Sequence, residues 1–181
     1  GTWIEPRLRA RVAGRWTDWY ARGSWSSVDQ ARRHSVARQD DADGQLLTDT
    51  LVLRKPAEAY QVAVDLSSTD PATSPTVSLV TVLASRRGSG SPRSAGVARG
   101  TALDVPERSQ MVYPDGAEAW CSPTSTSMVL AYWAQRLGRP ELDRAPPLVA
   151  AGTYDPVYRG TGNWPFNTAY AGRDGLLGYV T

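Results

Sequence analysis

Alternation of apolar and polar residues dominates the first half of the chain. Residues 8–12 (LRARV) and 60–66 (YQVAVDL) alternate most clearly. Residues 16–25 are rich in aromatics, residues 46–53 alternate imperfectly, and residues 76–83 form a β-branched apolar run. Because successive side chains of a strand point to opposite faces, these segments predict β-strands. The turn residues between them favour an antiparallel sandwich or barrel.

The second half has a helical pattern. Residues 122–137 predict a helix with few polar positions, and a helix that is apolar on most sides is a buried one. Gly138 marks its end. Further on, Asn163 can cap a short helix with Pro165 near its start. Residues 177–180 (LGYV) predict another strand where the sequence stops, which indicates a piece of a longer protein.

Composition changes between these two regions. Residues 86–102 are rich in Gly, Ser and Arg and have little to bury, which is typical of an exposed, flexible linker. The sequence thus predicts a β-rich accessory domain at 1–85, a linker at 86–102 and a second domain at 103–181. The predicted fold class is α+β, with an antiparallel β-sandwich-like domain followed by a mainly helical region.

Charge and hydropathy narrow the possible partners. Four arginines (Arg7, Arg9, Arg11 and Arg15) cluster near the start of a chain with net charge +2. Their alternation with apolar residues places them on one strand face, which favours a solvated surface over nucleic-acid binding. An apolar run long enough to span a membrane is absent from the sequence. The start also lacks a signal-peptide pattern, but the first residue is Gly1 and not Met.

Cys121 is the only cysteine and stands at the start of the predicted helix. Free backbone N–H groups and the helix dipole favour a thiolate at such a position and can bind an oxyanion. A lone cysteine is more often a small buried apolar residue, so both interpretations stay open on position alone. With a single histidine, His34, the chain offers no ordinary metal site. We expect no cofactor.

Gln110 precedes Cys121 by eleven residues. Its side-chain amide could supply a second oxyanion donor if the loop folds back to the helix start. The alternative is an ordinary surface glutamine. Trp120 and Trp133 flank the same stretch, and for Trp133 core packing is the expected role.

These residues together resemble a known family. The stretch from Val105-Pro106 through Gln110, followed by residues 120–133 (WCSPTSTSMVLAYW), is similar to the start of bacterial papain-like cysteine peptidases related to the bacteriocin-processing peptidases, peptidase family thirty-nine. Tyr154-Asp155 and residues 160–170 are similar to them as well. The β-region resembles the domain that precedes the peptidase in some large members. The resemblance implies the N-terminal, helical half of a papain-like domain at 103–181.

The resemblance also implies roles for particular residues. Cys121 would be the nucleophile and Gln110 the oxyanion donor. We also predict that Trp120, Asn163 and Trp164 contact the substrate, with core packing as the alternative role of Trp120. The family's base histidine and orienting Asp or Asn lie downstream of the helix, yet no histidine follows Cys121. His34 fits the base in neither order nor context, and Ser122 replaces the usual glycine. Because the base is missing, we expect little activity from this chain alone. The resemblance also implies a peptide or protein substrate and a secreted or cell-envelope location.

Two other functions remain open. The aromatic residues of the β-region (Trp16, Trp19, Tyr20 and Trp25) could stack on sugars or cell-wall polymers, which would make the chain a non-catalytic binding module. Core packing is the alternative role for these rings, and exposure on one face would discriminate between the two. The chain could also be an inactive peptidase relative that serves as a scaffold.

Overall fold

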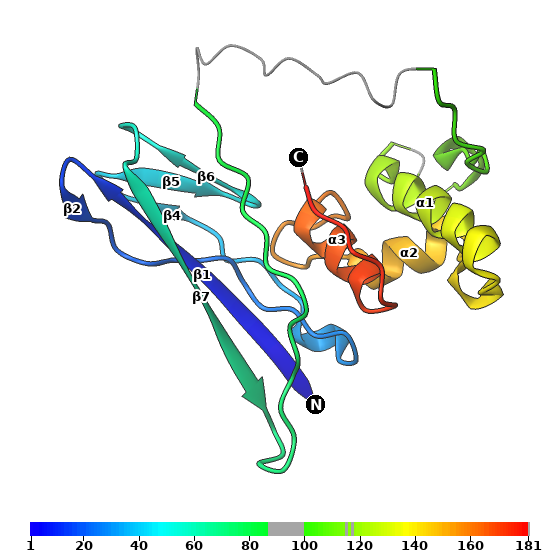
Figure 1. Ribbon diagram of the computed structural model, residues 1–181, viewed down its shortest axis with the longest axis horizontal. Coiled ribbons are helices and arrows are strands. Elements are labelled where there is room, and N and C mark those ends of the chain that lie inside the picture. The colour runs from blue at the N-terminus through cyan, green and yellow to red at the C-terminus, as the bar shows by residue number, and fades with distance from the viewer. Residues whose placement is uncertain (87–99, 115, 117, 181) are drawn as a thin grey trace.

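The computed structural model describes residues 1–86, 100–114, 116 and 118–180. Strands occupy the first 68 residues and α-helices follow from residue 121, so the predicted α+β class is confirmed. Figure 1 shows the long strand pair on one side and the three α-helices on the other. The predicted linker at 86–102 falls mainly on residues 87–99, which lie outside the described residues.

The larger sheet is built around one long strand. Its members are β1 (Thr2–Val12), β2 (Arg15–Trp16), β3 (Tyr20–Ala21) and β7 (Ala59–Ser68). β7 pairs antiparallel along β1, from Thr2 opposite Ser68 to Arg11 opposite Ala59. β2 and β3 pair antiparallel with the other edge of β1. The predicted strands at 8–12 and 60–66 therefore lie side by side.

A smaller antiparallel sheet contains β4 (Gln39–Asp40), β5 (Gly44–Leu47) and β6 (Thr50–Leu53). The single strand predicted at 46–53 is instead a hairpin, because a turn at residues 48–49 separates β5 from β6. The prediction of a strand at 76–83 was wrong, because these residues form no strand. Leu79, Val80 and Leu83 are 45%, 51% and 64% exposed. β-branched residues favour a strand only where it pairs with a neighbour and half buries its side chains. This segment forms no hydrogen-bonded ladder with another strand, so it stays irregular.

The α-helices are α1 (Cys121–Leu137), α2 (Pro146–Thr153) and α3 (Trp164–Gly172). Short 3-10 helices form at η1 (Gln30–Arg32), η2 (Gln110–Val112) and η3 (Pro140–Leu142). α1 ends as predicted, with Gly138 in the left-handed conformation at φ 62°. The prediction that α1 is buried on most sides was wrong, since Val129 and Trp133 are 47% and 40% exposed. The prediction of a strand at 177–180 was also wrong, because that segment has no regular secondary structure.

The core of the helical region includes a residue from the β-region. Trp25 packs with Leu130, Val149, Phe166 and Tyr170 in one buried cluster. The rings of Trp25 and Phe166 are 5.1 Å apart at a tilt of 57°, a favourable aromatic geometry. The two halves of the chain therefore share apolar packing. None of the helices in the described ranges is long and apolar enough to cross a membrane.

Candidate functional site

Cys121 is the first residue of α1, and its side chain is exposed. The preceding residue, Trp120, is the helix N-cap, and its carbonyl accepts from the Thr124 N–H at 2.9 Å. The Trp120 ring lies 5.9 Å from the Tyr113 ring and so close to Gly116 that a Cβ there would collide with it. These contacts fix the loop-to-helix junction that presents the thiol.

The thiol borders a groove of about 360 Å³ between the starts of α1 and α3. The groove is lined by Cys121, Ser122, Ser125, Thr126, Trp164, Asn167, Thr168 and Val180. Four of these residues carry hydroxyl groups, but the surface of the groove is mainly apolar, and Trp164, which is 55% exposed, adds to it. An exposed nucleophile in an open groove with backbone N–H groups at a helix start can attack an extended acyl substrate.

Hydrogen bonds hold the two sides of the groove together. The Thr126 hydroxyl donates to Asn167 Oδ1 at 3.1 Å, which ties α1 to α3. Asn167 Nδ2 donates to the carbonyl of Thr161 at 2.9 Å. The Thr161 hydroxyl in turn donates to the carbonyl of Ala119 at 3.2 Å, two residues before Cys121. The position of α3 relative to the thiol is therefore set by directional contacts.

Asn163 lies behind the groove, and Trp164 lies in it. Asn163 is 2% exposed. Its Oδ1 accepts from the Phe166 N–H at 3.4 Å, which caps α3 as the sequence predicted. Its Nδ2 donates to Asp155 Oδ2 at 2.9 Å. Of the three substrate contacts expected from the sequence, Trp164 lines the groove, Asn163 supports α3, and Trp120 caps α1.

Gln110 and His34 are placed elsewhere. Gln110 is half-buried and begins η2, in which the Ser109 hydroxyl accepts from the Met111 N–H at 3.2 Å. His34 is half-buried in the β-region, with Nδ1 3.2 Å from the carbonyl oxygen of Ser35. Neither residue is among the described residues that line the Cys121 groove. The oxyanion role of Gln110 therefore stays a prediction.

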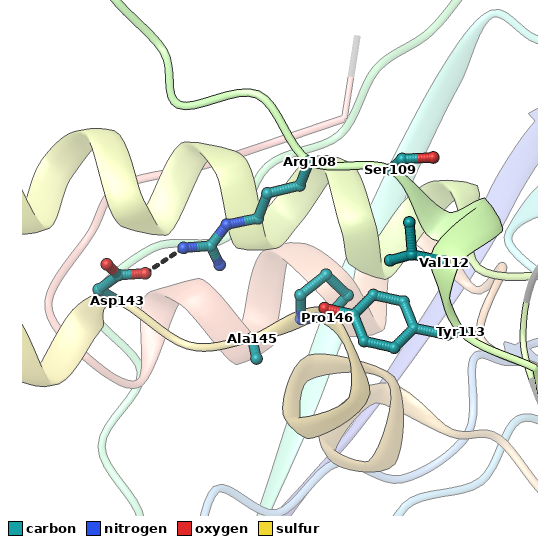
Figure 2. A pocket seen from close by; sticks show the side chains of 7 residues that line it. All are labelled: Arg108, Ser109, Val112, Tyr113, Asp143, Ala145 and Pro146. Carbon is teal, nitrogen blue, oxygen red and sulfur yellow. Dashed lines mark hydrogen bonds and ion pairs between the residues drawn. The ribbon is translucent and has the colours of Figure 1, made fainter.

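A second groove, of about 430 Å³, lies where the segment carrying Gln110 meets the start of α2 (Figure 2). Arg108 crosses it to form an ion pair with Asp143 and donates to the carbonyl of Arg144 at 2.5 Å. The Tyr113 ring and Pro146 lie at its other end. The contacts of Arg108 tie the segment before Cys121 to the residues that precede α2. Within the described ranges, His, Cys, Asp and Glu side chains form no group that could hold a metal ion.

Asp155 is a residue that the sequence did not single out for a role. It has no exposed surface and lies between α2 and α3. Burial would raise the pKa of Asp155, but hydrogen bonds from Asn163, Ser35 and Tyr158 outweigh it and hold that pKa below its ordinary value. An aspartate beside Pro156 is typical of an exposed turn, so no local signal revealed its burial.

Comparison with known families agrees with this architecture. Residues 1–85 match the family model described as Peptidase C39 N-terminal domain. Residues 102–176, which include Cys121 and all three α-helices, match the Peptidase_C39 like family. The comparisons found no match among curated proteins or solved structures.

Proposed function

Because the chain belongs to the peptidase C39-like family, we propose that it is a cysteine peptidase-like hydrolase with Cys121 as its nucleophile. The observation that carries the proposal is the exposed thiol at the first residue of α1, facing a groove that also holds Trp164. A peptide or protein segment is the proposed substrate. Trp164 would contact its apolar side chains. A secreted or cell-envelope location is part of the same proposal.

The proposed reaction passes through a thioester. The Cys121 thiolate attacks the scissile carbonyl carbon, and the oxyanion is held by the Cys121 backbone N–H and, by family resemblance, the Gln110 amide. Collapse of this intermediate expels the amine, which takes a proton from the general acid. Water then attacks the thioester and releases the carboxylic acid and the free thiol.

Proton transfer needs a general base, and the described residues that line the groove do not include a histidine. His34 is the only histidine of the sequence, and the residues lining the groove do not include it. General-base catalysis contributes about 10²–10⁴-fold to rates, so we expect little turnover from these 181 residues alone. The imidazole would come from a longer form of the protein.

The pH dependence of Cys121 alkylation tests the proposal. These 181 residues contain a single cysteine, and in a longer form peptide mapping follows the iodoacetamide label at Cys121. We expect a longer form that reaches the next histidine to react well below pH 7. Reaction only above about pH 8, near the ordinary thiol value, would contradict the peptidase proposal and favour an inactive scaffold. The Cys121→Ser variant is the control and should take up no label at that position.

Carbohydrate binding by the β-region is a second candidate. Trp16 and Trp19 are each 36% exposed, as stacking on sugars requires. The Arg9 guanidinium, however, lies over both rings, at 4.9 Å from Trp16 and 4.6 Å from Trp19. Tyr20 and Trp25 are buried, so half of the aromatic set has no access to a ligand. Sedimentation with cell-wall polymers that Trp19→Ala abolishes would support this candidate, and equal sedimentation would reject it.

A further inference from the structure

Asp155 joins two distant parts of the chain. Its Oδ1 accepts hydrogen bonds from the backbone N–H groups of Ser35, Val157 and Tyr158, at 3.1, 3.0 and 3.3 Å. Its Oδ2 accepts from Asn163 Nδ2 at 2.9 Å. Every partner is a donor, so this buried position suits a side chain that only accepts hydrogen bonds. An asparagine in place of Asp155 would point its own NH₂ group at one of these donors, and two facing donors cannot form a hydrogen bond.

One end of this junction is the docking segment, residues 24–35 of the β-region. Arg33 of this segment is 4% exposed and donates from Nη1 to the carbonyl of Gly152 in α2 at 2.6 Å. Trp25, at the start of the segment, packs on Phe166 in α3. The Ser35 N–H completes the docking by donating to Asp155. The segment thus contacts the helical region through apolar packing and through buried hydrogen bonds.

The other end of the junction is the groove. Asn163 connects Asp155 to the first turn of α3, because its Nδ2 binds Asp155 while its Oδ1 caps the helix. Trp164 follows directly and lines the same groove as Cys121. Loss of the Asp155 contact would free the capping side chain to change rotamer. The start of α3, and with it the indole of Trp164, would then shift relative to the thiol.

We propose that Asp155 is a positioning residue that couples the docking segment to the Cys121 groove by fixing Asn163 and thereby the place of Trp164. The inference rests on the proposed function, since it concerns how the same groove is shaped. It assigns the β-region a role in the site, because its Ser35 N–H is one of the donors that hold the carboxylate.

The test uses the whole chain and two alkylating reagents of different size, iodoacetamide and N-phenylmaleimide. Both react with the Cys121 thiolate, so the ratio of their rates cancels the fraction of thiolate and reports the shape of the groove. The first variant is Asn163→Ser, which keeps a capping oxygen but removes the amide group that donates to Asp155 and leaves a shorter side chain. The second is the exchange Asp155→Asn with Asn163→Asp, which keeps one donor and one acceptor at the contact. Asp65→Asn, at an exposed ion pair with Arg7, is the matched control.

We expect Asn163→Ser to change the rate ratio by about threefold or more, the size of a modest coupling between neighbouring residues. The exchange should return the ratio to near the wild-type value, and Asp65→Asn should leave it unchanged. A folded Asn163→Ser variant with the wild-type ratio would overturn the proposal, as would an exchange that folds without restoring it. Circular dichroism establishes folding in each case. Ordinary thiol reactivity in the longer form, in the alkylation test described above, would refute the proposed function alone, since the rate ratio does not depend on it.

Discussion

At the scale of single residues, Gly152 leaves room for an aromatic ring. A Cβ at Gly152 would collide with the ring of Tyr170. Tyr170 is 3% exposed, and Arg173 lies over its ring at 4.2 Å, so the ring has little freedom to retreat. We expect Gly152→Ala to lower the free energy of unfolding by about 1–3 kcal/mol, as overpacking does, measured by urea denaturation.

Gly172 provides the control for this substitution. It is also a helical glycine, at the end of α3, but a Cβ there would meet nothing within 4 Å. Because alanine favours a helix over glycine by up to about 1 kcal/mol, Gly172→Ala should leave the stability unchanged or raise it slightly. Equal effects at the two positions would show that backbone propensity, and not the contact with Tyr170, governs Gly152.

At the scale of elements, Trp25 is the main apolar link between the β-region and the helices. It is 8% exposed and contacts Phe166. We expect Trp25→Ala to cost about 3–5 kcal/mol of unfolding free energy, as large-to-small changes in a core do. Trp19→Ala is the matched comparison, since that ring is half-exposed and covered by Arg9. Its loss should cost about 1 kcal/mol, the size of an exposed cation–π contact. If Trp25→Ala and Trp19→Ala lowered the free energy of unfolding by similar amounts, Trp25 would not belong to a core shared by the β-region and the helices.

The same elements show what local pattern can and cannot predict. The sequence predicted α1, its glycine end and the Asn163 cap, because caps and helical periodicity are local signals. It missed α2 (Pro146–Thr153), a short helix that begins with two prolines. It also placed a strand at 76–83, where the propensity is right but no ladder forms. Docking of Ser35 on Asp155 spans 120 residues, and single-sequence patterns carry no information about such pairings.

At the scale of the whole molecule, carboxylates with little exposure to solvent make stability depend on pH. Burial would raise the pKa of Asp174, but hydrogen bonds and charge from Arg144 outweigh it and lower that pKa. Arg144 binds both carboxylate oxygens, at 2.5 and 2.8 Å. The pKa of Asp155 is lowered as well. In the unfolded chain both groups return to an ordinary value of about 3.9.

A carboxylate whose pKa is lower in the folded than in the unfolded state stabilises the fold at pH values above its unfolded-state pKa. This stabilisation is lost as the pH falls through the folded-state pKa. We therefore expect the free energy of unfolding to stay nearly constant between about pH 5 and 7 and to decrease steadily below about pH 4. Urea titrations at several pH values would measure this slope. Asp174→Asn should flatten the slope below pH 4 while lowering stability at pH 7, because the half-buried Arg144 then loses its anion. An unchanged slope would mean that Asp174 contributes nothing to the acid lability of the protein.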